Sequence, residues 1–327
     1  MGHLAKLGVV ALAALVVGDV VLVGLALRHV RGDPAPMTDV VAAPGPTSEP
    51  STTPTDDPSE TPTPTPESTP ESTPEPTRNP AADAPRMLID IGTGQAVARA
   101  ATGACGKGGA KVELSLDGGR TFRPSSVPAA AVVLRVASVD ADNAWLVATG
   151  ADCRAVTTFR TTNGGGTWER TEGSDGSWHR LAEAGTRIHA PAGPADIPCA
   201  DGQDVTGFST LSADEAYTLC GDGAVQRTVD GGQEWTAQGR LAGADDLDFV
   251  DATTGLAVVT GARSCAGVAV MATGDGAETW ESRACVETEV DGLPDVSADG
   301  ERAYLGVGDA VFYSDDSGAT WEPRTAP

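Results

Sequence analysis

The chain has 327 residues and a formal net charge of -24, with 40 glycines, 23 prolines and only 4% aromatic residues. Because 15 of the prolines lie between residues 34 and 85, about 240 residues remain to form a packed core. The acidic balance excludes nucleic acid as an expected partner, since phosphates are bound by clustered Lys and Arg.

Residues 1–33 are predicted to form an N-terminal signal anchor, with a single transmembrane helix over residues 7–27. This run is apolar apart from Asp19 and its glycines, and about 20 such residues span a bilayer. A cleaved signal peptide is the alternative. The apolar stretch of such peptides is shorter, ~7–15 residues, and no Ala-x-Ala cleavage site follows this one. The sequence therefore favours an uncleaved anchor.

Residues 34–85 are predicted to be a disordered linker rich in Pro, Thr, Ser and Glu. Closely spaced prolines remove backbone donors and fix φ, so neither a helix nor a sheet can form. Such segments favour extended polyproline II, and this composition is typical of O-glycosylated stalks outside cells.

Six cysteines follow the linker and none precedes it. An even count in an exported domain indicates three disulfides, for which 15 pairings are possible. We favour the sequential pairing, which joins Cys105 with Cys153, Cys199 with Cys220, and Cys265 with Cys285. No two cysteines have the Cys-x-x-Cys spacing of a zinc or redox site.

One eight-residue pattern occurs five times after the linker, with its third position at residues 117, 163, 230, 275 and 316. The steps between copies are 46, 67, 45 and 41 residues. A period in the forties is typical of a propeller blade of four short strands. Short apolar runs precede four of the copies, at residues 144–149, 216–220, 255–260 and 303–307, and they suit buried strands.

The residue types of the pattern indicate a tight turn. An Asp or Asn at the third position accepts hydrogen bonds from backbone N–H groups ahead of it, and glycine supplies positive φ. The Ser or Thr hydroxyl bonds back across the turn, and the aromatic residue covers it. We therefore expect structural roles for Ser115, Asp117, Gly119, Thr121, Phe122, Thr161, Asn163, Gly165, Thr167, Trp168, Thr228, Asp230, Gly232, Trp235, Thr273, Asp275, Thr279, Trp280, Ser314, Asp316, Gly318, Thr320 and Trp321.

The five copies resemble the Asp-box, or BNR repeat, Ser-x-Asp-x-Gly-x-Thr-Trp. They depart from it at Phe122, Asn163, Glu234 and Ala277. The resemblance covers residues 87–327, within the propeller domain predicted for residues 86–327. It implies an all-β fold, a β-propeller of the sialidase and photosystem II assembly-factor type. In that group the boxes lie on outer hairpins, far from the central channel, and mark no active site.

Five copies imply at least five blades. The 67-residue step is about 22 residues too long for one blade, and the surplus lies within residues 171–203. It is interpreted either as a worn sixth box around residues 174–179 or as an inserted loop. We therefore expect five to six four-stranded blades, with seven as the upper limit. Pairing between the segment from Met87 and the C-terminal segment is expected to close the ring.

Nothing in the sequence marks a catalytic residue. Sialidases carry a Phe/Tyr-Arg-Ile-Pro motif, and the segment Arg86-Met87-Leu88-Ile89 at the corresponding place lacks the aromatic residue and the proline. Tyr217, Tyr304 and Tyr313 all lie in repeat elements. We assign no cofactor.

Two histidines, His179 and His189, lie in the surplus segment with acidic residues nearby. Two histidines ten residues apart are a weak signal for a metal site. They are interpreted as surface residues on a loop held by Cys199, and no metal is assigned.

The sequence thus predicts a membrane-anchored extracytoplasmic propeller that binds a protein or a cell-envelope glycan without catalysis. The alternatives are an exo-sialidase-like glycoside hydrolase acting on extracellular glycans and an assembly factor for a membrane complex. The charges that flank the anchor, Lys6 before it and Arg28 and Arg31 after it, lean slightly against export. The linker and the cysteines outweigh them. We expect a single-pass cell-membrane protein, attached through its N-terminal helix, with the propeller on the extracellular side.

Overall fold

The structure of the protein, a computed structural model, describes residues 86–172, 177–183 and 185–324. The chain separates into units at residues 1–70 and 71–327, and all described residues belong to the second unit. The predicted anchor and linker lie outside the described ranges. Within those ranges, no helix is long and apolar enough to cross a membrane.

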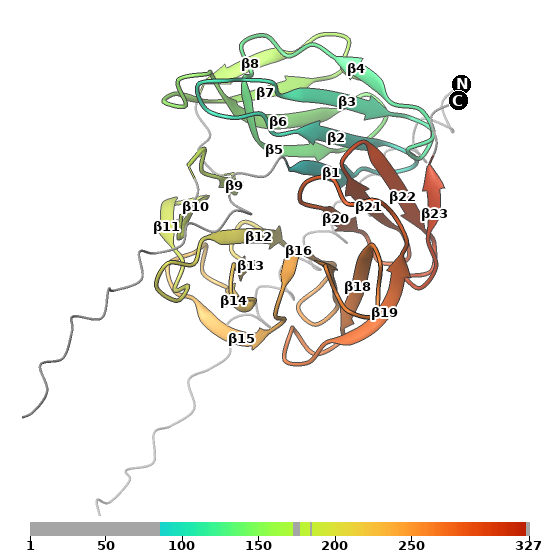
Figure 1. Cartoon of the computed structure of the whole chain (residues 1–327). Coiled ribbons are helices and arrows are strands. Elements are labelled where there is room, and N and C mark those ends of the chain that lie inside the picture. Colours follow the sequence, from blue (N-terminus) through green and yellow to red (C-terminus); the bar gives the residue numbers. More distant parts are fainter. Residues whose placement is uncertain (1–85, 173–176, 184, 325–327) are drawn as a thin grey trace, which may run out of the picture. The chain divides into compact units, whose positions relative to one another are not determined.

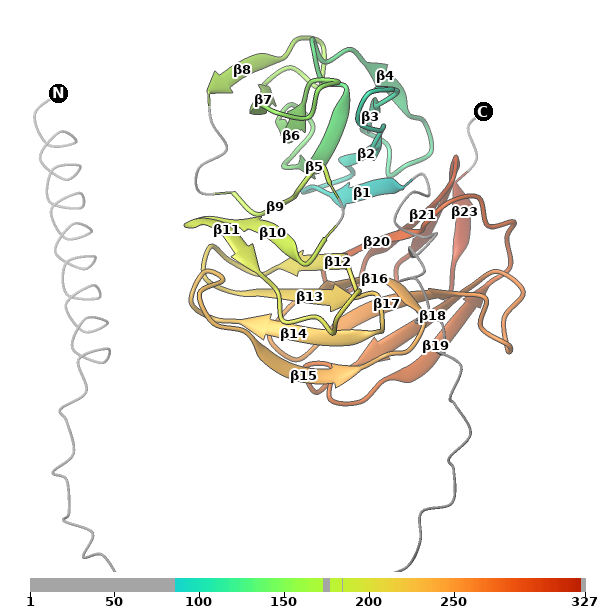
Figure 2. The same cartoon turned by 60° about the vertical axis from the view of Figure 1, so that its left-hand side comes forward.

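The described residues form six antiparallel sheets arranged as a ring (Figures 1 and 2). The first three sheets contain β1 (Met87–Ile91), β2 (Val97–Ala101), β3 (Lys111–Ser115), β4 (Arg123–Ser125), β5 (Val132–Ser138), β6 (Ala144–Thr149), β7 (Val156–Thr161), β8 (Glu169–Glu172), β9 (His179–Arg180), β10 (Arg187–Ala190) and β11 (Gly193–Asp196). The last three contain β12 (Val205–Thr210), β13 (Ala216–Cys220), β14 (Ala224–Thr228), β15 (Thr236–Arg240), β16 (Ala244–Phe249), β17 (Gly255–Thr260), β18 (Val268–Thr273), β19 (Glu281–Val286), β20 (Asp295–Ala298), β21 (Ala303–Val307), β22 (Ala310–Ser314) and β23 (Glu322–Arg324). This arrangement is a six-bladed β-propeller, within the predicted range.

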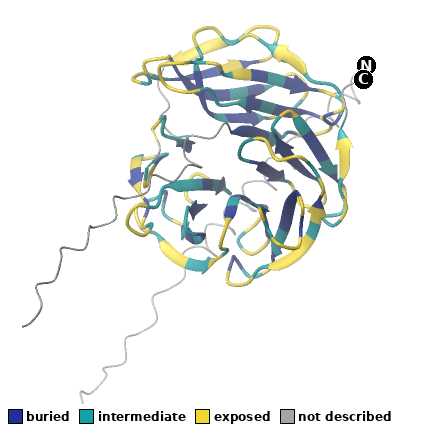
Figure 3. Cartoon of the chain, in the orientation of Figure 1, coloured by how far each residue is buried: buried dark blue, intermediate teal, exposed yellow. Residues whose placement is uncertain are grey.

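Each sheet pairs its strands in chain order, with its first strand facing the centre of the ring (Figure 1). The apolar runs that the sequence analysis singled out form second strands, and every residue of β13 and β21 is buried. They are buried because each sheet is packed between two neighbours. For example, Leu88 and Leu114 of the first sheet pack with Val136 and Leu146 of the second. Figure 3 shows buried residues concentrated on these inner strands, with exposed residues along the outermost strands and turns.

The ring closes without a shared sheet, so the expected strand pairing between the terminal segments is wrong. The first sheet uses only residues 87–125, and the last uses only residues 295–324. Among the described residues, backbone pairing between the two ends is limited to an isolated bridge from Arg86 to Leu293. Closure comes instead from the packing of β1 against β20 and β21 and from a hydrogen bond that Ile89 N donates to Asp295 Oδ2 (2.9 Å).

The surplus segment is a blade of its own. It forms the third sheet, β9–β11, which has three strands and lies between β5 and β12 (Figure 2). The interpretation as an inserted loop is therefore wrong. The worn-box interpretation also fails where it can be examined, because residues 177–179 lead into the first strand of this sheet. Residues 174–176 of that segment lie outside the described ranges.

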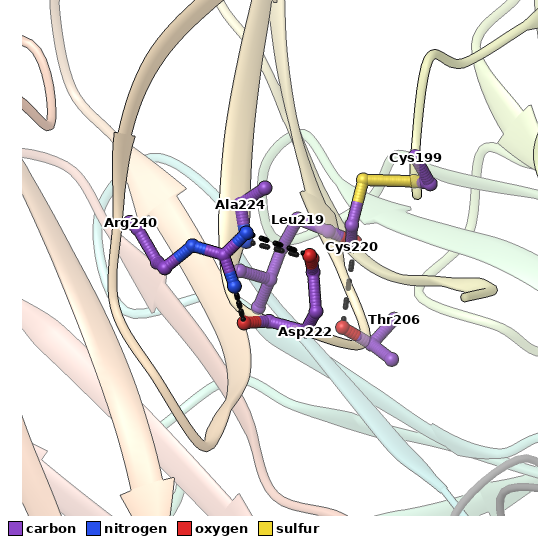
Figure 4. The surroundings of a disulfide bond; sticks show 7 residues. All are labelled: Cys199, Thr206, Leu219, Cys220, Asp222, Ala224 and Arg240. Carbon is purple, nitrogen blue, oxygen red and sulfur yellow. Dashed lines mark hydrogen bonds and ion pairs between the residues drawn. A yellow bond between two sulfur atoms is a disulfide. The ribbon is translucent and has the colours of Figure 1, made fainter. Parts of the chain in front are cut away.

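Three disulfides join the six cysteines in the sequential pairing, Cys105 to Cys153, Cys199 to Cys220 and Cys265 to Cys285. The second one connects the chain after β11 to the end of β13 in the next sheet (Figure 4). Just beyond Cys220, Asp222 accepts hydrogen bonds from Ala224 N (3.1 Å) and Arg240 Nη2 (2.8 Å). The turn to which the third sheet is attached is therefore itself fixed.

Candidate functional site

The five repeats form the turns between the third and fourth strands of the five four-stranded sheets, at the outer part of the ring. In the first, Ser115 Oγ accepts Gly119 N (2.9 Å), and Asp117 accepts both the N–H (2.8 Å) and the hydroxyl (2.6 Å) of Thr121. In the second repeat, Asn163 accepts the N–H of Thr167 (2.9 Å). These polar groups bond within their own turn.

The turns hold their carboxylates in the ionised form. Hydrogen bonds from the backbone and hydroxyl of Thr320 lower the pKa of Asp316 to about 2. The pKa of Asp275 is lowered by Thr279 in the same way. The aromatic residues close the turns: Trp321 Nε1 donates to Gly318 O (2.9 Å). These contacts are those of structural turns, at a distance from the centre of the ring.

The two histidines lie in strands and not on a surface loop; His179 is buried, so its interpretation as a surface residue is wrong, and His189 is half-buried. His179, in β9, is fully buried, and its ring stacks on that of His189 in β10 with centroids 4.3 Å apart. Both Nδ1 atoms lie within hydrogen-bonding distance of Ser177 O. Burial, and then the charge of His189, lowers the pKa of His179 to about 4, so the His179 ring is neutral at pH 7. In the described ranges, no cluster of three His, Cys, Asp or Glu could hold a metal.

The centre of the ring contains a cavity of about 200 Å³, lined by the first strands of the six sheets. Charged side chains that the sequence analysis did not single out gather around it. They are Arg86, Asp90, Arg135, Arg180, Asp246, Asp248 and Asp295, which we call the channel cluster. Four carboxyls and three guanidinium groups thus meet in the interior of one small ring.

The aspartates of the channel cluster connect neighbouring sheets. Asp90 Oδ2 in β1 accepts Ser138 N at the end of β5 (2.7 Å). Asp246 Oδ2 in β16 accepts Val296 N in β20 (3.2 Å). Together with the Asp295 bond that closes the ring, these contacts replace a shared strand at three junctions between sheets.

The fourth, fifth and sixth sheets are connected through one relay. Ser209 Oγ in β12 accepts Phe249 N (2.9 Å) and donates to Asp248 Oδ1 (2.6 Å), both in β16. The other oxygen of Asp248 accepts Ala298 N in β20 (2.8 Å). Both oxygens of this half-buried carboxyl therefore have a partner in the framework.

The arginines bridge the place where the first strand is shortest. Because β9 has only two residues, Arg135 reaches across it from β5, donating to Trp178 O (2.8 Å) and to Thr210 Oγ1 in β12 (2.8 Å). From β9 itself, Arg180 donates to Thr206 O in β12 (2.8 Å). The thin third blade is thus held on both sides by guanidinium groups.

The remaining contacts of the arginines are with the acids. Arg180 Nη2 lies 3.4 Å from Asp246 Oδ1, and Arg86 Nη1 lies 3.7 Å from both Asp246 and Asp295. Within the described residues, Arg86 Nη1 and Arg180 Nε are buried without a hydrogen-bond acceptor. These two N–H groups of the cluster could donate a hydrogen bond to a further acceptor.

Burial dominates the titration of the cluster. It raises the pKa of Asp90 to about 7, against the hydrogen bond from Ser138 and the charge of Arg135. It likewise raises the pKa of Asp248 to about 7. Burial and the nearby Asp295 raise the pKa of Asp246 well above its usual range. Burial likewise raises the pKa of Asp295.

A sequence signal for the channel cluster did exist. Asp90 is the one charged residue of the otherwise apolar run 88–91, and Arg135 interrupts a similar run, whereas three of the six residues of 244–249 are aspartates. A charge inside such a strand must be paired or neutralised. With 35 acidic residues after position 85, composition could not identify these few. Their position within a strand pattern could have done so.

No protein family model matches the chain, and no curated protein matches it. Among solved structures, the chain is similar to YCF48 from Cyanidioschyzon merolae, at 17% identity and a TM-score of 0.27 over 72% of this chain and 68% of that one. It is also similar to the GH74 enzyme of Niastella koreensis, at 17% identity and a TM-score of 0.29 over 72% of this chain and 37% of that one. A third similar structure is the Aleuria aurantia lectin in complex with alpha-methyl-L-fucoside, at 12% identity and a TM-score of 0.45 over 73% of this chain and 93% of that one. By its own geometry, the chain is a six-bladed β-propeller protein.

Proposed function

We propose that the protein is a binding propeller of the BNR type that recognises an extracytoplasmic protein or cell-envelope glycan and catalyses no reaction. In this proposal residues 7–27 anchor it in the cell membrane. The linker of residues 34–85 then holds the propeller up to ~160 Å from the bilayer, if it is fully extended as polyproline II. An assembly role on a membrane complex would be one form of such protein binding.

The observation that carries the proposal is how the channel cluster uses its polar atoms. Each of its aspartates accepts a backbone N–H from a neighbouring sheet, and its arginines bond to carbonyls and acids of the same ring. Groups committed to framework contacts support a structural role for the channel. The outer faces and the grooves between blades are then the surfaces available to a partner.

A glycoside hydrolase is the second candidate, and one observation favours it. Asp90 and Asp248 border the same cavity, and burial raises the pKa of both carboxyls to about 7. A carboxylic acid that stays protonated near neutral pH suits a general acid in glycoside cleavage. To act in this way, the two carboxyls would have to break their hydrogen bonds to backbone N–H groups and contact the substrate instead.

One experiment separates the two candidates. The full-length chain is applied to a glycan array, photo-crosslinked in intact cells, and incubated with fluorogenic glycosides. If the chain is a binding protein, it should capture a glycan or a partner protein without releasing the fluorophore. Release that disappears in Asp90→Asn and Asp248→Asn chains, with unchanged circular dichroism, would contradict the proposal and establish the hydrolase. Absence of both capture and release would also overturn the binding function.

A further inference from the structure

A pocket of about 530 Å³ opens between the fifth sheet (β16–β19) and the sixth sheet (β20–β23). We call it the inter-blade pocket. Its apolar lining comes from Val250, Leu256, Ala272 and Ala298, which lie at the ends of strands near the repeat turns. The volume lies in the range of about 300–1,000 Å³ typical of ligand sites.

One other junction of the ring is nearly closed at the corresponding place. Between the first and second sheets, the corresponding strand ends enclose only about 10 Å³. There β3 carries Leu114 and the first repeat carries Leu116, whereas the corresponding residues of β18 and the fourth repeat are Ala272 and Gly274. The facing turn is also one residue shorter, 299–302 against 139–143, and it includes Gly300. Smaller side chains and a shorter turn thus open the inter-blade pocket.

The space at Gly274 is unfilled. A Cβ atom built at this position meets no atom within 4 Å, and its φ is not positive. A larger residue can therefore enter the pocket from this position without backbone strain. The first repeat demonstrates that this position of the turn accepts leucine.

The rim of the pocket is acidic. Glu281, the first residue of β19, is exposed, and its side chain forms no ion pair or hydrogen bond within the described ranges. Arg283, also on the rim, already donates to Ser317 O (3.3 Å) and Asp316 O (3.1 Å) across the junction. Exposed acids flank the lining residues in sequence: Asp251, Glu278, Asp299 and Glu301. Residues 86–327 as a whole carry a net charge near -17.

We propose that the inter-blade pocket takes an apolar side chain from a basic segment of a partner protein, whose adjacent cation pairs with Glu281. This inference rests on the proposed binding function and specifies the partner's chemistry. Charge complementarity favours a basic partner over an acidic one. Among the described residues that line the pocket none is aromatic, so a sugar ring finds no flat face to stack on. A peptide side chain fits this surface better than a glycan does.

The probes are three synthetic peptides: Lys-Lys-Leu-Lys-Lys, Lys-Lys-Ala-Lys-Lys and Glu-Glu-Leu-Glu-Glu. Their affinities for the full-length chain are measured by calorimetry. The leucine peptide should bind at least about tenfold more tightly than the alanine peptide, because it buries a leucine side chain. The acidic peptide should not bind measurably.

Two pairs of variants locate the site. Gly274→Leu fills the pocket and should weaken the basic leucine peptide about tenfold or more, whereas Thr162→Leu, at the same position of the second repeat, should change its affinity less than about twofold. Glu281→Lys should lower the affinity of the basic leucine peptide. Glu322→Lys, at the equivalent exposed position of β23, should leave that affinity unchanged.

Each result decides the proposal. Equal affinity of the leucine peptide for the wild-type and Gly274→Leu chains would overturn the site while leaving the binding function intact. No binding of the basic peptides, or glycan binding that Gly274→Leu abolishes, would overturn the peptide as the occupant. Loss of the overall binding function would appear separately, as a chain that captures neither glycan nor protein in intact cells.

Discussion

Aspartate side chains of this propeller behave in opposite ways according to their surroundings. In the outer turns, Asp316 accepts several local hydrogen bonds in contact with solvent, and these bonds lower its pKa to about 2. In the channel, Asp90 is half-buried and accepts one backbone N–H, and burial raises its pKa to about 7. The number of hydrogen bonds decides the first case and desolvation decides the second. The same residue type thus stabilises local turns at the outside and junctions between sheets at the centre.

The hydroxyl that begins each repeat should be needed for stability. Ser314 Oγ accepts the N–H of Gly318 (2.9 Å) in a buried position and donates to Asp316 Oδ1 (2.8 Å). Ser314→Ala leaves that N–H without an acceptor and should lower the free energy of unfolding by about 1–3 kcal/mol. Urea titration of the full chain measures this change.

Ser314→Thr is the matched control, because three of the other repeats carry Thr at this position. It should stay close to the wild-type stability. If the Thr variant lost as much as the Ala variant, side-chain packing and not the hydrogen bond would account for the effect.

At the scale of strands and turns, the third sheet differs from the other five. It has three strands, and its first strand has two residues. Guanidinium groups from β5 and β9 and the disulfide Cys199–Cys220 bond it to its neighbours. A sheet with so few backbone hydrogen bonds of its own depends on these contacts to its neighbours. The four-stranded sheets are stabilised by more backbone hydrogen bonds within the sheet.

Removing that disulfide should therefore loosen one blade selectively. The disulfides Cys199–Cys220 and Cys265–Cys285 close loops of nearly equal length, with separations of 21 and 20 residues. In the chain-entropy account, each contributes about 3 kcal/mol. Replacing either pair by serine should lower global stability by a similar amount. Only the loss of Cys199–Cys220 should speed amide hydrogen exchange in β9–β11.

Hydrogen exchange followed by mass spectrometry on both serine variants gives the answer. Equal protection of β9–β11 in the two variants would show that the arginines alone hold this sheet. Faster exchange in the Cys265 variant would mean that the sheets do not open independently.

The sequence predicted those elements whose structure depends on neighbouring residues. The repeat turns and the strands before them follow from local chemistry, since the side chains of residues such as Thr228 and Asp230 form their hydrogen bonds within four positions. The third sheet carries no repeat in its described residues, so it lacked that signal. Its two-residue strand β9 is stabilised by Arg135, 43 residues from Trp178. The channel cluster was missed for the same reason, because each of its bonds joins residues far apart in the chain.

At the scale of the whole molecule, hydrogen bonds to the aspartates of the channel cluster join the sheets of the ring. Asp295 joins the last sheet to the first, Asp90 joins the first to the second, and Asp246 joins the fifth to the sixth. Such buried carboxyls are costly when ionised and acceptable when protonated. The ring's stability should therefore depend on pH through its centre and not through its highly charged surface.

The pKa values of Asp90 and Asp248 are about 7 in the folded protein, above the ordinary value of 3.8. Their stabilising contribution is full below about pH 4 and is lost as pH rises through 7. His179 acts in the opposite direction, because its lowered pKa of about 4 favours the fold as pH rises towards 6.5. Above pH 6.5 most of the opposing contribution of His179 is already complete, and between pH 6.5 and 8 the loss should be on the order of 1 kcal/mol for each of these two carboxyls.

The wild-type melting temperature should therefore fall by a few degrees between pH 6.5 and 8. Asp90→Asn, which retains an acceptor for Ser138 N and has no charge to lose, should show a smaller fall. The charged groups that act on Asp90, Arg135 and Asp248, stay in place in this variant. Differential scanning calorimetry at constant ionic strength measures both slopes. A wild-type melting temperature that is flat or rises over this interval would show that Asp90 and Asp248 are already ionised at the centre of the folded ring.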